Sequence, residues 1–142
     1  MGKLAERLRD PSRSGVYRTG RAEVVAAAAG EGRLDLAQVS LERCERKEPL
    51  LQTIAAVLGF PQWFGGNWDA LEDCLGDLSW RSGDGHVLLF ERFENLPSDE
   101  RGVLVDVLAS SAEYWAARQR PFFAVFIDPG RTLELPELYR ER

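Results

Sequence analysis

The chain has 142 residues, of which 44% are hydrophobic and 29% charged, and its net charge is −5. A chain of this length and composition is typical of one globular domain, which excludes a disordered or fibrous protein. No apolar run reaches the roughly 20 residues that span a bilayer, and the first residues lack the apolar centre of a signal peptide, so we expect a cytoplasmic protein. In that compartment Cys44 and Cys74 are expected to be reduced and packed rather than bridged.

Hydrophobic patterns predict helices that alternate with strands along the chain. In chain order these are a helix over residues 3–9, a short strand over 15–19, a helix over 21–29, a strand over 33–41, helices over 48–58 and 68–78, a strand over 85–90, a helix that begins at Ser98, and a strand over 121–127. Short strands covered by helices are typical of a small parallel sheet with right-handed crossovers. The sequence therefore predicts an α/β fold.

The negative charge is concentrated in residues 60–80. This stretch contains Asp69, Glu72, Asp73 and Asp77 and no Lys or Arg, whereas the rest of the chain is close to neutral. At about 100° per residue, all of these carboxylates share one face of the predicted helix. A solvated polar face is the common interpretation of such a helix. Like charges four residues apart cost roughly 0.2–0.5 kcal/mol per pair, however, and no base in the stretch relieves them. The pattern therefore favours a surface for a basic partner over one for nucleic acid or an anionic membrane.

Two large aromatic residues stand on the glycine-rich loop before this helix. Trp63 and Phe64 precede Gly65 and Gly66, and Asn67 is a good N-cap for the helix that follows. Aromatic residues on such loops are enriched at binding surfaces, although either ring could instead close the core. The pattern favours a binding role for Trp63 and leaves both roles open for Phe64.

A resemblance to the barstar family is carried by residues 60–75, which read Phe-Pro-Gln-Trp-Phe-Gly-Gly-Asn-Trp-Asp-Ala-Leu-Glu-Asp-Cys-Leu. The family's signature is approximately Leu or Phe, Pro, any residue, Tyr, Tyr or Phe, Gly, any residue, Asn, any residue, Asp-Ala-Leu, any residue, Asp-Cys-Leu. The resemblance implies a small three-stranded parallel sheet packed with helices over residues 33–128. An N-terminal extension over 1–32 is then expected to pack on this domain, and residues 129–142 form a C-terminal tail.

The resemblance also implies a function, because barstar is an intracellular protein inhibitor of barnase, a small basic secreted ribonuclease. It implies a one-to-one complex in which the acidic helix and the preceding loop enter the active site of such a ribonuclease. No catalytic residue, metal, cofactor, small-molecule substrate, nucleic acid or membrane is expected to take part.

Matched position by position, Asp73 resembles the family's central carboxylate, which is expected to lie deepest among the basic groups of the enzyme. Asp69 matches a second carboxylate of the motif, and Trp63 matches the loop aromatic that packs against the partner. The expected partner-binding residues are Trp63, Phe64, Gly65, Gly66, Asn67, Asp69, Glu72, Asp73, Gly76 and Asp77. Among them, Gly65 and Asn67 are expected to shape the loop.

The chain also departs from barstar at this surface. Barstar has Trp where this chain has Glu72, Gly where it has Asp77, and Tyr at both loop aromatics. The face is therefore more negative, and we expect either a different ribonuclease or binding with a different emphasis. Barstar's further interface glutamate, on the helix after the second strand, has no clear counterpart. Glu100 is a candidate that spacing alone does not settle.

Two alternatives stay open at the level of sequence. An enzyme could use Asp69 and Asp73 as general acid and base or as Mg²⁺ ligands, which would make the protein a carboxylate-dependent hydrolase. The chain has no phosphate-binding loop, nucleophile elbow or Cys/His metal spacing, and the position of His86 in an apolar strand favours a structural role. The second alternative is an immunity or regulatory module of the same fold that binds a partner other than a ribonuclease.

Overall fold

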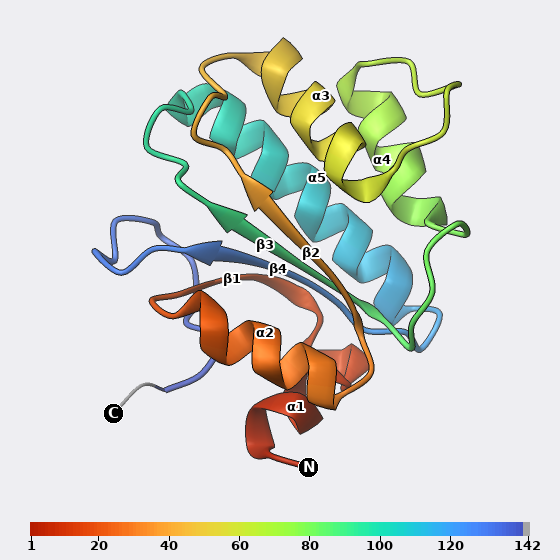
Figure 1. The fold of residues 1–142 in the computed structure, drawn as a ribbon, viewed down its shortest axis with the longest axis vertical. Coiled ribbons are helices and arrows are strands. Elements are labelled where there is room, and N and C mark those ends of the chain that lie inside the picture. Colours follow the sequence, from red (N-terminus) through yellow and green to blue (C-terminus); the bar gives the residue numbers. More distant parts are fainter. Residues whose placement is uncertain (141–142) are drawn as a thin grey trace.

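The computed structural model describes residues 1–140 and shows helices alternating with strands along the chain (Figure 1). None of the described helices is long and apolar enough to cross a membrane. The elements are, in chain order, α1 (Lys3–Leu8), a 3-10 helix (Pro11–Arg13), β1 (Gly15–Thr19), α2 (Ala22–Glu31), β2 (Asp35–Ser40), α3 (Lys47–Leu58), α4 (Trp68–Asp77), β3 (His86–Glu91), α5 (Ser98–Ala116) and β4 (Phe122–Ile127).

The strands form one parallel sheet of four strands in the order β1-β4-β3-β2, so the fold is α/β. The predicted three-stranded sheet is therefore wrong. The additional strand is β1, which pairs with β4 so that Gly15 lies opposite Phe123 and Thr19 opposite Ile127. The residue pattern does predict a strand at this place. It does not reveal the pairing, because parallel strands are joined through distant parts of the chain and leave no local turn signal.

Helices cover both faces of the sheet, with α3, α4 and α5 on one side and α1 and α2 on the other (Figure 1). Both central strands are apolar along almost their whole length, as expected for strands buried on two sides. Alternate residues of β3 and β4 serve the two layers. Leu88, Phe90, Phe122, Ala124 and Phe126 pack under α3, α4 and α5, whereas Val87, Leu89, Phe123 and Val125 pack under α1 and α2.

The ends of the described chain are part of this architecture. Residues 1–32, predicted as an extension, supply β1 together with α1 and α2. Part of the predicted tail runs along the outer edge of β1, where the backbone N–H of Leu138 donates to the carbonyl of Arg18 at 3.0 Å. Residues 141–142 of that tail lie outside the described residues. The boundaries between extension, domain and tail remain predictions.

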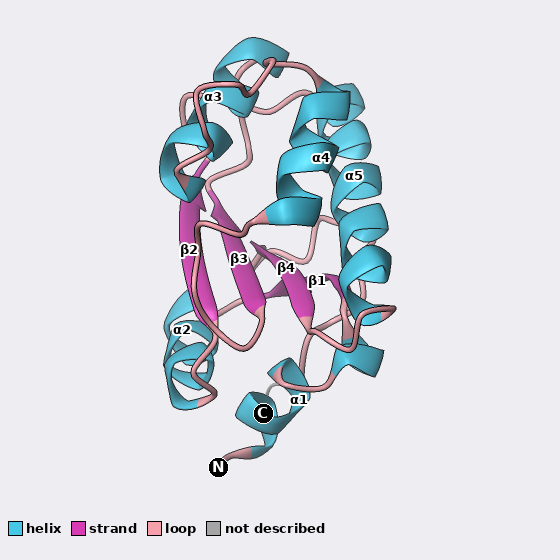
Figure 2. Ribbon diagram, turned by 90° about the vertical axis from the view of Figure 1, so that its right-hand side faces the viewer, coloured by secondary structure: helices cyan, strands magenta, loops and turns pink. Residues whose placement is uncertain are grey.

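Local capping sets the bounds of α4. The side chain of Asn67 accepts a hydrogen bond from the backbone N–H of Ala70 at 2.7 Å, which is the N-cap that the sequence predicts. The helix ends where Leu78 adopts a left-handed conformation with φ of 48°. The indole of Trp115 on α5 then donates to the carbonyl of Leu75 at 2.8 Å. This hydrogen bond and the packing of the two helices hold α4 alongside α5 (Figure 2).

Candidate functional site

The acidic face of α4 points to solvent while its other face is buried. Asp69, Glu72, Asp73 and Asp77 are exposed, and the buried residues of the helix are Leu71, Cys74 and Leu75. Within residues 1–140, no ion pair reaches any of the four carboxylates. Among the described residues, the one hydrogen bond to these carboxylates is donated by the backbone N–H of Ser79 to Asp77, at 3.3 Å. The negative charge of this face is therefore uncompensated inside the described chain.

Both cysteines are free and buried, which confirms the prediction that they are reduced and packed. Burial, followed by the negative charges of Asp73 and Asp77, raises the pKa of the Cys74 thiol. The thiol on the inner side of α4 therefore stays protonated at neutral pH and serves packing.

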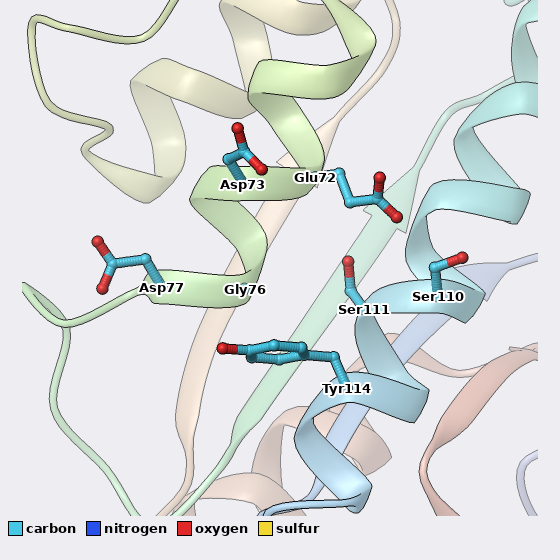
Figure 3. Close-up of a pocket in the computed structure, with 7 residues that line it drawn as sticks. All are labelled: Glu72, Asp73, Gly76, Asp77, Ser110, Ser111 and Tyr114. Atoms are coloured by element: carbon cyan, nitrogen blue, oxygen red, sulfur yellow. The ribbon is translucent and has the colours of Figure 1, made fainter.

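A groove of about 470 Å³ separates the acidic face of α4 from the last turns of α5. Figure 3 shows Glu72 reaching toward α5, whereas Asp77 points away from it. The lining residues include three carboxylates and no base: Glu72, Asp73, Gly76, Asp77, Ser110, Ser111 and Tyr114. The structure thus brings four of the predicted binding residues together at one groove, and it adds a second wall from α5.

The α5 wall is the part of the site that the sequence did not predict. Ser111 is only 2% exposed, and its hydroxyl donates to the carbonyl of Val107 at 2.9 Å. Ser111 lies at helical spacing from the buried apolar residues Leu104, Leu108 and Trp115. This spacing is the sequence signal that could have predicted its burial.

The candidate residue Glu100 does not line the groove. It lies in the first turn of α5, ten positions before Ser110, which corresponds to about 15 Å along a helix axis. The groove instead meets α5 at a pair of serines and a tyrosine. A glutamate on this helix is therefore not part of the groove.

The loop before α4 divides into exposed and packed residues. The side chain of Trp63 is 61% exposed, the highest value of any aromatic residue in the described chain. Phe64 packs against the core, with its ring edge-on to that of Phe60 at 5.0 Å between centroids. Gly66 has a φ of 71°, a conformation that favours glycine. The loop thus presents Trp63 to solvent while Phe64, Gly66 and the Asn67 cap fix its shape.

A buried polar network holds the segment that follows α4. Asp35 at the start of β2 accepts two hydrogen bonds from the guanidinium of Arg81, at 2.7 and 2.9 Å. The same carboxylate lies 2.9 Å from Nδ1 of His86, whose side chain is only 3% exposed. Arg81 also donates to the carbonyl of Leu58 at the end of α3, at 3.3 Å. The network therefore connects the segment after α4 to the sheet and to α3, and His86 has a structural role in it.

Opposing effects set the charges of this network. Burial lowers the pKa of His86, against the hydrogen bond to Asp35, which acts to raise it. For Asp35, burial acts to raise the pKa, but the hydrogen bonds from Arg81 and His86 outweigh it and the pKa lies below its ordinary value. At neutral pH the network therefore consists of a carboxylate, a guanidinium and a neutral imidazole that donates from Nδ1.

Acidification is expected to destabilise the fold through His86. In the unfolded chain this histidine binds a proton near its ordinary pKa of 6.5, whereas in the folded chain its pKa is lower. Between these two values the unfolded state binds more protons, so the free energy of unfolding falls with falling pH, by at most about 1.4 kcal/mol per pH unit. Urea unfolding between about pH 5 and 7.5 measures this slope, since carboxylates titrate mainly below that range.

The control for this experiment is clean because His86 is the single histidine of the chain. His86→Asn keeps an N–H group that can reach Asp35 but has no titratable group. The variant is expected to lose the slope in this pH window. An unchanged slope in the variant would contradict the assignment to His86.

Among residues 1–140, no group of three or more His, Cys, Asp or Glu side chains is arranged to hold a metal ion. A comparison with curated proteins found no match. Among solved structures, the chain is similar to the Aeropyrum pernix ORC2 protein in ADPNP–ADP complexes, with a TM-score of 0.50 and 19% identity. That likeness covers 87% of this chain and 39% of the ORC2 chain, and at this identity it shows the fold alone.

The family comparison covers the groove and the loop together. The family model described as Barstar (barnase inhibitor) matches residues 34–127, a stretch that contains β2, β3, β4 and the three helices of one sheet face. This match extends well beyond the residues of the motif and takes in more than half of the chain. The chain therefore belongs to the barstar family of barnase inhibitors.

Proposed function

We propose that this protein inhibits a small basic ribonuclease of the barnase type by placing the acidic face of α4 and the Trp63 loop in its active site. Family membership supports this proposal. The observation that carries it is the row of exposed carboxylates on α4, which no described basic side chain neutralises. Repulsion among these carboxylates costs folding free energy in the free protein, and a basic partner would offset this cost on binding.

The chemistry of ribonucleases explains why an acidic helix suits this task. A cleft that binds RNA phosphates must present cationic donors, and carboxylates form charge-assisted hydrogen bonds with the same donors. Asp69, Asp73 and Asp77 are spaced four residues apart, so they line one side of a helix as phosphates line a strand of RNA. An inhibitor of this type blocks the substrate without offering a bond to cleave, and it needs no catalytic residue of its own.

The helix is held in position before the partner arrives. Its buried residues, its Asn67 cap and the hydrogen bond from Trp115 to the carbonyl of Leu75 fix its place on the sheet. The network around Asp35 fixes the segment that follows it. A preorganised surface loses little conformational entropy on binding, so more of the interaction free energy appears as affinity.

We assign the strongest contact to Asp73, which lies at the centre of the acidic face, and supporting contacts to Asp69 and Trp63. The exposed indole is suited to pack on the rim of the cleft, since exposed aromatic residues frequently anchor interfaces. Glu72 and Asp77 add negative charge where barstar has none, so we assign to them the choice among related ribonucleases.

The proposed function is tested by adding the protein to barnase and following RNA cleavage. We expect inhibition that is complete at one molecule of inhibitor per enzyme. We also expect an association rate that falls steeply as salt rises, because steering between opposite charges is screened beyond about 8 Å at physiological ionic strength. Stopped-flow fluorescence measures this rate, with Trp63 as a suitable reporter.

The extra charge at Glu72 and Asp77 also favours a second candidate, a module of the same fold that binds a basic protein other than a ribonuclease. The two functions separate in a panel of barnase-like ribonucleases. A panel in which no enzyme is inhibited would exclude the first function and leave the second. Inhibition of any member, with release of activity when the inhibitor is removed, supports the first.

A further inference from the structure

Tyr114 stands out on the α5 wall because its large ring is partly exposed and yet closely held. Its side chain is 42% exposed. A Cβ at Gly76 of α4 would lie 3.6 Å from the ring, an ordinary van der Waals distance, so the ring lies directly against the helix at this glycine. Figure 3 shows the ring crossing from α5 toward α4 beneath Gly76. Tyr114 thereby closes one end of the acidic groove.

Two neighbouring residues fix the orientation of this ring, one on α5 and one just after its end. The guanidinium of Arg118 lies over it at 3.5 Å from the ring centroid, and also donates to the carbonyl of Tyr114 at 3.0 Å. Trp115 lies edge-on to it at 5.8 Å between centroids. The guanidinium of Arg118 is thus engaged with the ring and with the backbone of Tyr114. An aromatic side chain held in this way is ready for binding at a small entropic cost.

The hydroxyl group of Tyr114 has no partner among the described residues. No hydrogen bond joins it to any group of residues 1–140, and it points toward the α4 side of the groove (Figure 3). On the facing wall stand Glu72, Asp73 and Asp77, all without a basic partner in the described chain. The groove therefore offers hydrogen-bond acceptors in two directions, charged ones from α4 and neutral oxygens from α5.

We propose that Tyr114 is a specificity-determining residue of the inhibitory surface, which selects an arginine side chain of the partner over a lysine in the groove between α4 and α5. This inference rests on the proposed function, since it names the side chain that the groove receives. It goes beyond the acidic face itself, because Tyr114 stands on α5 and outside the motif of residues 60–75.

The selectivity follows from the difference between the two cations. A guanidinium is planar and carries five N–H donors around its edge. It can therefore donate to carboxylates of α4 and to the oxygen of Tyr114 at the same time. It is also less strongly hydrated than an ammonium, so it loses less hydration free energy when it enters the groove. An ammonium is a compact point charge that gains mainly from the carboxylates, so the α5 wall adds little to its binding.

Two synthetic peptides, hexa-arginine and hexa-lysine, test this inference without knowledge of the natural partner. Isothermal titration at low salt gives the affinity of each peptide for the full chain. We expect hexa-arginine to bind more tightly, and Tyr114→Phe to lower the ratio of the two affinities by about two- to tenfold, the value of one hydrogen bond. The variant keeps the ring, so its thermal stability is expected to match that of the original protein.

Tyr17→Phe is the matched control. It removes the same hydroxyl group on the opposite face of the sheet, where Tyr17 packs against the layer of α1 and α2. This control is expected to leave the affinity ratio unchanged, which separates the effect of Tyr114 from the general preference of acidic surfaces for arginine.

The outcomes separate this inference from the proposed function. Equal affinities for the two peptides, no binding of either, or a ratio that Tyr114→Phe does not change would each overturn the role of Tyr114, even if barnase is inhibited. A Tyr114-dependent preference for arginine in a protein that inhibits no ribonuclease would keep the groove's selectivity and reject the ribonuclease as its target.

Discussion

Replacing Asp73 with alanine is expected to weaken the complex with a barnase-like ribonuclease by about 2–5 kcal/mol, the usual cost of truncating one member of a buried charge pair. In the free protein Asp73 is exposed and has no ion-pair partner among the described residues. In the complex it would be enclosed by cationic groups that its loss leaves unpaired. Surface plasmon resonance measures the effect, which should lie mainly in the dissociation rate.

The same substitution should not destabilise the free protein. Asp69 and Asp77 each lie four residues from Asp73, so its removal relieves two repulsions of roughly 0.2–0.5 kcal/mol each. Asp106→Ala is the matched control, because Asp106 is also an exposed aspartate on a helix but does not line the groove. Equal losses of affinity in the two variants would show that net charge alone, and not the position of Asp73, determines binding.

Replacing Asp35 with alanine is expected to lower the free energy of unfolding by about 3–5 kcal/mol, the range for breaking a buried ion pair from one side. The side chains of Asp35 and Arg81 are 11% and 20% exposed, so the guanidinium would keep little water in place of its partner. His86 would lose its hydrogen bond in the same step. Denaturation by urea measures the change as a lower midpoint with an unchanged slope.

Asp84→Ala provides the comparison for this prediction. Asp84 also pairs with an arginine, Arg9, at 3.0 Å, but the two side chains are 60% and 37% exposed. Exposed pairs contribute about 0–1 kcal/mol, so the midpoint should move little. If both variants lost the same stability, burial of the Asp35 network would not be the cause of its effect.

The sequence predicted best where the signal was local. The helix at residues 68–78 was placed by the Asn67 cap and by the separation of its acidic and apolar faces, and the structure has it at Trp68–Asp77. The strands at residues 85–90 and 121–127 are nearly continuous apolar runs, which is the pattern expected of strands that are covered on both faces. In each case neighbouring residues carry enough information to define the element.

The sequence failed where the contact was distant. Nothing near Gly15–Thr19 indicates that this strand pairs with β4, and the three-stranded sheet that the family resemblance implies leaves it out. Asp35 lies 46 residues before Arg81 and 51 before His86, and only the folded chain brings it within hydrogen-bond distance of them. The place of Tyr114 beside α4 was missed for the same reason, because periodicity identifies the buried face of α5 but not the helix that packs beside it.

The stretch that carries the proposed binding surface is shorter than the stretch that the fold requires. The stretch matched by the family, residues 34–127, contains the acidic helix and the whole layer that supports it. A chain trimmed to that stretch would lack α1 and α2. It would therefore expose Val87, Leu89, Phe123 and Val125 to water, because these helices cover them. A contiguous apolar face of this kind promotes self-association. The proposed inhibitory surface thus depends on α1 and α2, which cover the opposite face of the sheet.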